Sequence, residues 1–203
     1  MNYTSVLLTL AGVLMLSVMS PGPNFVVVTS TAIASRRAGI ATGLGLAAAS
    51  GTWALIAIAG LSLLLAHVSW IHAVLRLVGA AYLVWLGLKM MLTARRPLPT
   101  GERLATSGWS AGKRGYLVSM TNPKAIAFYG SIFALLIPAH APFWFGAVVV
   151  VMAVAISCGW YCSVALLASH PAVRQLLVRR KAVLDTITGA LLMGLGARLL
   201  AGS

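Results

Sequence analysis

Apolar residues fill most of the chain, in long stretches separated by short polar breaks. The stretches span approximately residues 4–35, 39–66, 69–93, 115–137, 142–169 and 183–201. A helix needs about 20 apolar residues to cross the roughly 30 Å hydrocarbon core of a bilayer, and each stretch approaches or exceeds that length. The pattern therefore predicts an all-α polytopic membrane protein with six transmembrane helices.

The polar connections between these spans differ in charge. Two basic residues lie in the turn at 36–37, five in the linker 94–114 and four in the loop 170–182. These three connections hold eleven of the fifteen Lys and Arg residues, whereas the turns at 67–69 and 138–141 hold none. Basic loops stay on the cytoplasmic side of a membrane. We therefore expect the basic connections in the cytoplasm and both termini on the outer, periplasmic side.

The linker divides the six spans into two sets of three, within residues 1–93 and 115–203. Since three is odd, two halves with the same fold would cross the membrane in opposite directions, as do the inverted repeats of many secondary transporters. Segments 81–89 and 190–198 support this division, because both close with Leu, Gly, one variable residue and a base. We expect one membrane domain of two inverted three-helix repeats, joined by the cytoplasmic linker 94–114.

The first span contains a proline-rich break about halfway along it. Its residues are Ser20, Pro21, Gly22, Pro23 and Asn24. Each proline lacks an N–H, so carbonyls one turn earlier lose their helical partners and need protein, water or a ligand inside the bilayer. We interpret the stretch as a gap between two half-helices, and expect N–H groups of about residues 25–27 to face a carboxylate. The alternative is a proline kink without a binding role.

The fourth span carries a similar break at Asn122 and Pro123, followed by Lys124. Pro123 is expected to release the carbonyl of Ser119, and an asparagine adjoins a proline in both breaks. A buried cation such as Lys124 marks a substrate or ion path in membrane proteins. The alternative is that its side chain extends to the cytoplasmic interface. We therefore take Asn122, Pro123 and Lys124 as candidate substrate-binding residues beside the first break.

Polar and glycine positions in the second and third spans also allow two interpretations. Ser50 lies near the middle of the second span and Tyr82 lies in the third, so both are candidate substrate-binding residues. Glycines in the second span favour close packing of helices over a binding role, and they are compatible with a homodimer. They are Gly39, Gly43, Gly45 and Gly51.

Composition limits the classes of function. Charged residues make up 8% of the chain and apolar residues 60%, with a net charge of +13. Because the bases lie in short tracts and not on a polar face with interleaved aromatics, we expect no nucleic-acid partner. Cys158 and Cys162 are expected to be small buried apolar residues, and the histidines fall at predicted helix ends or turns. The sequence therefore predicts neither a metal site nor a cofactor.

Residues 20–24, 81–87 and 122–125 together resemble the LysE/RhtB family of bacterial amino acid exporters. The resemblance covers the whole chain, including its length, its six spans and its basic linker. It implies a secondary transporter, not an enzyme, in the bacterial inner membrane. Such a transporter would export amino acids such as threonine, homoserine, leucine or lysine at the expense of the proton gradient.

One departure from the family concerns acidic residues. Many relatives carry an acid or a histidine in the second helix, where this chain has Ala-Ser-Gly-Thr-Trp at 49–53. Only Glu102 and Asp185 are acidic, and we expect Asp185 to be a charge near the N-terminus of the last helix. Without an acid in the middle of the membrane, proton coupling lacks a carrier and a neutral substrate is favoured over a cationic one.

Two other classes of function are alternatives to export. A non-transporting membrane subunit would have no need for two polar breaks inside the bilayer. A membrane enzyme acting on lipid-linked phosphate generally needs carboxylates, histidines or metal ligands at the interface. The two acids of this chain lie far apart in the sequence and do not supply such a set.

Overall fold

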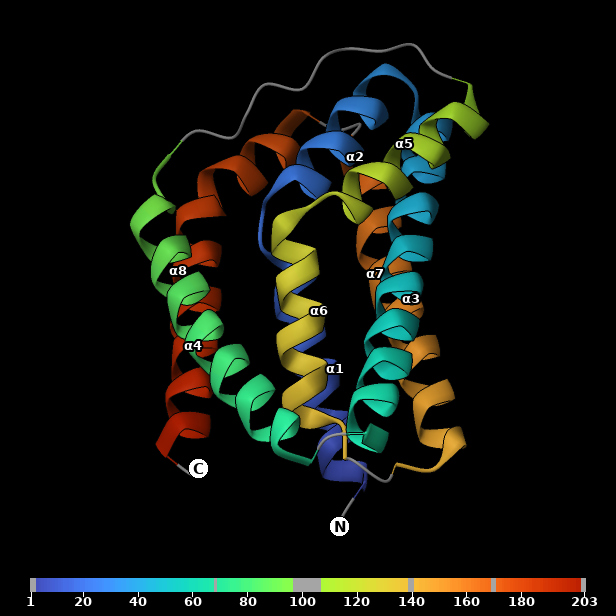
Figure 1. Ribbon diagram of the computed structural model, residues 1–203. Helices are drawn as coiled ribbons and strands as arrows, with labels where there is room; N and C mark the ends of the chain where they lie inside the picture. Colours follow the sequence, from blue (N-terminus) through green and yellow to red (C-terminus); the bar gives the residue numbers. More distant parts are fainter. Residues whose placement is uncertain (1–2, 68, 97–106, 139–140, 169–170, 202–203) are drawn as a thin grey trace.

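The computed structural model describes residues 3–67, 69–96, 107–138, 141–168 and 171–201, and these are helical apart from short turns (Figure 1). No strand occurs among them. The helices are α1 (Tyr3–Met19), α2 (Pro23–Ala34), α3 (Arg36–His67), α4 (Ser69–Thr93), α5 (Gly108–Met120), α6 (Pro123–Leu136), α7 (Phe143–Leu167) and α8 (Pro171–Ala201). The prediction of an all-α protein is confirmed for this part of the chain.

Two of the described helices are long and apolar enough to cross a membrane alone, namely Arg36–Gly60 within α3 and the whole of α7. The pair of α1 and α2 also passes when it is counted as one broken span, bent by 57°. Leu77–Thr93 within α4 is a shorter apolar helix. These helices agree with a membrane protein, while the division into six spans stays a prediction.

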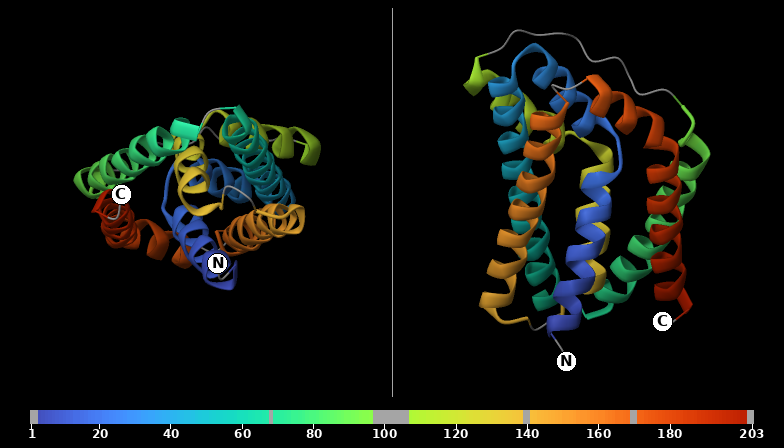
Figure 2. Two further views of the ribbon diagram at one scale, coloured as in Figure 1. Left: turned by 60° about the horizontal axis from the view of Figure 1, so that its bottom comes forward. Right: turned by 180° about the vertical axis from the view of Figure 1, so that it is seen from behind.

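The helices form three groups in space, as both views of Figure 2 show. The antiparallel helices α4 and α8 lie on one side, α3 and α7 lie on the other, and α1 and α6 lie between them. Helix α3 also packs against α2 and α5. In Figure 1, α1 begins and α8 ends at one end of the bundle, while α5 and α8 begin at the opposite end.

Close contacts of α3 with its neighbours depend on glycine. A Cβ on Gly43 would lie 3.2 Å from the backbone of Cys162 in α7, and a Cβ on Gly45 would overlap the backbone of α5. Gly39 faces the backbone of Ala32 in α2, and Gly51 faces the side chain of Val154 in α7. The expected packing role is confirmed for Gly39, Gly43 and Gly45, because a side chain at these positions would meet the backbone of a neighbouring helix.

Glycines also join α4 to α8. Gly87 faces the backbone of Gly189, and Gly196 faces the backbone of Ala80, so the two helices run in opposite directions. Gly87 and Gly196 occupy equivalent places in the two similar segments noted in the sequence. The contact therefore joins the last helix of one predicted half to the last helix of the other.

Two predicted connections are partly helical in the structure. The basic loop expected at 170–182 forms the first part of α8, which begins at Pro171, and the end of the linker forms the start of α5 at Gly108. Proline favours the first helical turn, and the Ala, Arg, Gln and Leu residues that follow it are strong helix formers. Charge marks where an apolar span ends but not where a helix ends, so the loop prediction was wrong there.

Two apolar cores fill the bundle on either side of the helix breaks. One core includes Leu14 of α1 and Phe133 of α6, with residues of α7 and α8. The other includes Val18 and Val28 at the two sides of the first break, with Val164 of α7. The polar residues described next lie at the boundary between these cores.

Candidate functional site

The first break separates α1 from α2 at the residues that the sequence indicates. Gly22 has an extended backbone (φ −157°, ψ −160°) and precedes Pro23, the first residue of α2. The N–H of Val26 donates to the Gly22 carbonyl, so the first turn of α2 leaves Asn24 and Phe25 without an acceptor inside the helix. We expected these groups at about residues 25–27. The correction follows from Pro23, whose fixed φ starts the helix earlier.

The second break separates α5 from α6 and is capped by Asn122. The Asn122 side chain accepts a hydrogen bond of 3.0 Å from the N–H of Lys124, which satisfies a donor of the first turn of α6. The Ser119 carbonyl, which Pro123 deprives of its usual helical partner, accepts from the Trp53 indole at 3.4 Å. The break is thus held in a defined geometry by the side chain of Trp53 in α3 and by that of Asn122, the residue before α6.

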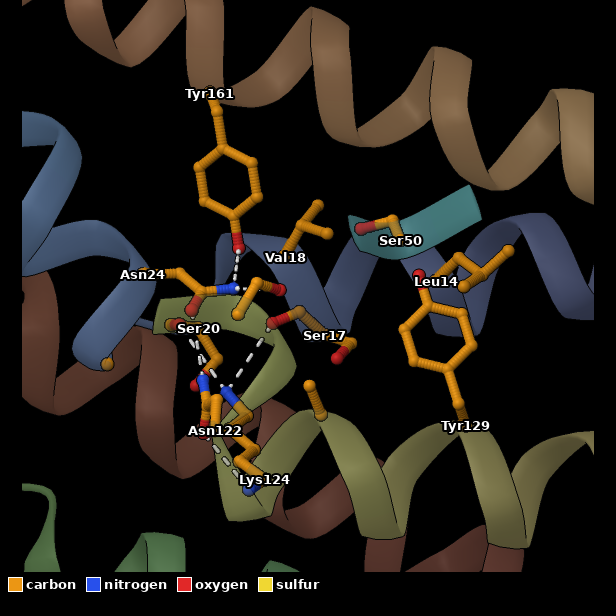
Figure 3. Close-up of a pocket in the computed structure, with 13 residues that line it drawn as sticks. Leu14, Ser17, Val18, Ser20, Asn24, Ser50, Asn122, Lys124, Tyr129 and Tyr161 are labelled. Atoms are coloured by element: carbon orange, nitrogen blue, oxygen red, sulfur yellow. Dashed lines mark hydrogen bonds between the residues drawn. The ribbon is translucent and has the colours of Figure 1, made fainter. Parts of the chain in front are cut away.

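The two breaks meet through their asparagines (Figure 3). Asn122 Nδ2 donates to Asn24 Oδ1 at 3.1 Å. Asn24 Nδ2 lies 3.3 Å from both the Ser119 hydroxyl and the Tyr161 hydroxyl, and donates to them. The side-chain amide of Asn24 therefore connects α2 to α5, to α7 and to Asn122, the residue before α6.

Lys124 extends from α6 to the end of α1. Its Nζ donates to the carbonyl oxygens of Ser17 and Ser20, each at 3.4 Å. The Ser17 carbonyl is the one that Pro21 was expected to release. The ammonium also faces the negative, C-terminal end of the α1 dipole. In this structure the Lys124 ammonium lies at the break between α1 and α2.

A cavity of about 30 Å³ lies where these residues converge. Of the predicted site residues, six line it: Ser20, Gly22, Asn24, Ser50, Asn122 and Lys124. Its volume suffices for about two water molecules. A ligand larger than this requires the surrounding helices to move apart.

The remaining predicted site residues have other places. Pro21 and Pro23 flank Gly22 in the backbone of the break, and Pro123 begins α6. Tyr82 is not among the lining residues, and its ring lies 5.3 Å from that of Trp85 on the same helix.

Further residues of the cavity were not predicted to bind substrate. They are Leu14, Ser17, Val18, Ser119, Ala125, Tyr129 and Tyr161. Tyr129 and Tyr161 are both about 5% exposed or less. A buried tyrosine hydroxyl usually needs a polar partner. Two tyrosines within apolar spans were therefore a signal in the sequence that could have indicated a polar site.

Asp185 lies beside the first break, contrary to expectation. It is 5% exposed and sits in the middle of α8, because α8 begins at Pro171. The Ser20 hydroxyl donates to Asp185 Oδ1 at 3.0 Å, and Lys181 Nζ forms an ion pair with Oδ2 at 2.7 Å. Asp185 is therefore not a charge at a helix N-terminus, and the inference that no acid lies near the break was wrong.

No group of three His, Cys, Asp or Glu side chains able to hold a metal occurs within the described ranges. The charged group that lines the cavity is the Lys124 ammonium, and the other polar groups are amides, hydroxyls and carbonyls. Apolar helices that surround such a polar cavity at two helix breaks are characteristic of helical membrane transporters.

Comparison with known proteins places the chain within this class. Residues 7–203 match the profile of the LysE type translocator family. The chain is 35% identical over 204 residues to the threonine efflux protein of Escherichia coli K12, covering 95% of this chain and 96% of that protein. For the threonine efflux protein of Salmonella typhi the identity is 33%, with the same coverage. The chain belongs to the LysE type translocator family.

A shorter match links the chain to another member. It is 35% identical over 130 residues to the leucine efflux protein of Klebsiella pneumoniae, covering 61% of this chain and 59% of that protein. No solved structure matches the chain.

Proposed function

We propose that this protein is a secondary active exporter of neutral amino acids, with the substrate bound between the two broken helices. The observation that carries the proposal is the convergence of Asn24, Asn122 and Lys124 in one cavity, although they come from opposite halves of the sequence. A shared site between two half-structures is the arrangement on which alternating access depends.

The cavity offers partners for both charged groups of an amino acid. The Lys124 ammonium and the first-turn N–H groups of α2 are suited to the carboxylate. The carbonyl oxygens of Ser17 and Ser20, which now accept from Lys124, are suited to the substrate ammonium. Binding would then transfer Lys124 from these carbonyls to the substrate carboxylate.

Two features favour a neutral over a cationic side chain. Lys124 already places one positive charge in the cavity, so a cationic side chain would meet a like charge at low dielectric constant. The relatives are named for threonine and leucine, whose side chains are uncharged. L-threonine and L-leucine are therefore the first substrates to test.

Helix packing suggests which parts move. The α4 and α8 pair and the group around α3 and α7 are each joined through glycine contacts, and the broken helices lie between them. We propose that one group rocks against the other, which opens the cavity alternately to each side of the inner membrane. The two groups need not coincide with the sequence halves 1–93 and 115–203.

The rival functions lack comparable support. A membrane enzyme for lipid-linked phosphate would require acids or metal ligands at the interface, and the described acid, Asp185, is buried and paired with Lys181. A non-transporting subunit offers no reason for Lys124 to occupy the break.

The test is an efflux assay with matched asparagine variants. Cells preloaded with threonine- or leucine-containing dipeptides are expected to release the free amino acid faster when the protein is present. Asn24→Ala and Asn122→Ala are each expected to abolish this release, because each removes an amide that lines the cavity and joins the two breaks.

The sequence has one further asparagine, Asn2, and Asn2→Ala is the matched control, which is expected to export normally. Membrane abundance of each variant is measured on immunoblots, so that a folding defect is not read as lost transport. Normal export by both Asn24→Ala and Asn122→Ala would contradict the site. Equal efflux of every amino acid with and without the protein would contradict the function.

A further inference from the structure

Asp185 is a buried carboxylate in a chain that has only two acidic residues. Its residue exposure is 5%, and it lies on α8 next to the first helix break. An ionisable group inside a membrane protein is energetically costly and is found where ions or protons pass. The substrate site proposed above does not use Asp185, so its burial needs another explanation.

The charges around Asp185 come from two helices. Lys181 on α8 binds Asp185 Oδ2 at 2.7 Å, and Lys124 on α6 is near enough for the Asp185 charge to act on it. The α1 and α2 break contributes the Ser20 hydroxyl, and the end of α4 contributes the Ala94 carbonyl, which accepts from Lys181 at 3.0 Å. With Asp185 ionised, one negative charge offsets two positive charges; with Asp185 protonated, both positive charges are unbalanced.

Ser20 connects this cluster to the cavity. Its hydroxyl donates to Asp185 Oδ1 at 3.0 Å, and Ser20 also lines the cavity beside Lys124 (Figure 3). A hydroxyl has one donor and two acceptor positions. While its proton points at an ionised carboxylate, the Ser20 oxygen is an acceptor toward the cavity. When the carboxyl carries a proton and donates to Ser20, the hydroxyl proton must turn away from Asp185.

We propose that Asp185 is the proton carrier of this transporter. The protonation state of Asp185 then decides whether the Ser20 hydroxyl accepts a hydrogen bond from the substrate. This inference rests on the proposed export function. With Asp185 ionised, Ser20 accepts from the substrate ammonium, and the negative charge of the carboxylate favours that ammonium. A proton added to one Asp185 oxygen removes both effects and breaks the ion pair with Lys181. Substrate in the cavity and a proton on Asp185 therefore do not occur together, which is what a transporter that exchanges one for the other across the membrane requires.

The route for the proton is also indicated by contacts. Lys181 connects Asp185 to Ala94, at the end of α4 that is predicted to face the cytoplasm. A proton that enters through the cavity from the outer side protonates the carboxylate, and it leaves on the cytoplasmic side when Lys181 again pairs with Asp185. The carboxylate is restored, so proton and charge balance over one cycle.

The experiment uses the full-length protein in phospholipid vesicles, with L-threonine as the probe. Exchange of labelled for unlabelled threonine is measured over a range of pH, and an internal pH dye records proton movement during net threonine transport. For the wild type, apparent threonine affinity is expected to fall as the pH is lowered, by up to about tenfold per pH unit, which is the limit for one competing proton.

Asp185→Asn is expected to exchange threonine more slowly and without pH dependence, and to move no protons. Asp185→Glu keeps a titratable group, so pH dependence and proton movement are expected to persist. Glu102→Gln removes the other acid and is expected to match the wild type. If Asp185→Asn does not assemble, Ser20→Ala provides the test, because it keeps the acid and breaks its hydrogen bond to the cavity. The pH dependence of its exchange is then expected to be weaker than in the wild type, because only the charge effect of Asp185 remains.

The outcomes separate the two proposals. Proton movement that persists in Asp185→Asn, or exchange in Ser20→Ala that depends on pH as strongly as in the wild type, would overturn the proposal for Asp185 and Ser20 and leave amino acid export intact. A wild type that exchanges no amino acid would overturn both the export function and this inference.

Discussion

Lys124 carries its charge on a flexible stem from α6 to the carboxyl end of α1, where it meets the carbonyls of Ser17 and Ser20 at 3.4 Å. These contacts are long for charge-assisted hydrogen bonds, whose usual length is about 2.7–2.9 Å. A substrate carboxylate offers the ammonium a stronger partner than two peptide carbonyls. Lys124 is thus held at the site by interactions that a substrate is able to replace.

Replacing this charge tests the role of Lys124 directly. Lys124→Met keeps an unbranched side chain of similar length but removes the ammonium that is proposed to bind the substrate carboxylate. Export of threonine is therefore expected to fall at least about tenfold, equivalent to about 1.4 kcal/mol of lost binding. Lys89→Met is the matched control, because Lys89 is exposed and lies over the Trp85 ring at 4.6 Å. Both are compared by initial efflux rates at equal membrane abundance. Equal rates for the two variants would contradict substrate binding by Lys124.

At the scale of whole helices, prolines and glycines have separate tasks. Prolines end α1 before Gly22 and start α2 and α6, which exposes backbone groups at the bundle centre. Glycines join helices at the flanks, where Gly87 and Gly189 bring the backbones of α4 and α8 together. Rigid flanks around interrupted central helices let the cavity change shape without loss of the packing that holds each flank.

The α4 and α8 contact predicts a strong effect of side-chain size. Gly87→Leu places a side chain against the Gly189 backbone, and overpacking of this kind costs about 1–3 kcal/mol. The variant is expected to unfold at a lower temperature in detergent than the wild type. Gly194→Leu is the matched control on α8, because Gly194 is exposed and a Cβ there meets nothing within 4 Å. Similar melting temperatures for both variants would contradict a tight α4 and α8 interface.

At the scale of the molecule, a hydrogen bond joins the first break to α8. The α4 and α8 pair lies to one side in Figure 2, and Ser20 of the break donates to Asp185 of that pair. A change of charge on Asp185 therefore acts at a contact between two groups of helices. Such a position allows protonation to be linked to movement of the groups, in addition to its effect on substrate binding.

Orientation in the membrane is a prediction at the same scale. We expect the start of α5 in the cytoplasm and the start of α7 outside, because the basic connections lie at the end of the bundle where α5 begins. Trp109 and Phe143 mark these two places and are 84% and 93% exposed. In a variant with Cys158 and Cys162 replaced by serine, Phe143→Cys is expected to react with an impermeant maleimide in intact cells.

Trp109→Cys is expected to react only after the cells are made permeable. The fraction labelled is measured by a shift in gel mobility, with the serine double variant as the unlabelled control. The reverse pattern would place the termini in the cytoplasm and invert the predicted direction of the site.

The sequence alone was sufficient for the features that depend on local chemistry. Apolar run length predicted a helical membrane protein, and the missing N–H groups of Pro21, Pro23 and Pro123 predicted both breaks, because these consequences follow from a few adjacent residues. The same reasoning indicated that Ser20, Asn24, Asn122 and Lys124 share a site. The sequence reasoning was wrong at residues 170–182, where a run of basic residues was interpreted as a loop although α8 begins at Pro171.

Only the tertiary structure decided which distant groups meet. The Asn24 to Asn122 bond and the contacts of Asn24 with Tyr161 join residues whose separation in sequence gives no periodic signal. The positions of Tyr82 and Asp185 also differ from expectation for this reason. Tyr82 does not line the cavity, whereas Asp185 contacts Ser20, which does. The packing of α8 against α4, through Gly189 and Gly196, and the hydrogen bond from Ser20 to Asp185 are contacts between residues far apart in the sequence, and local chemistry does not predict them.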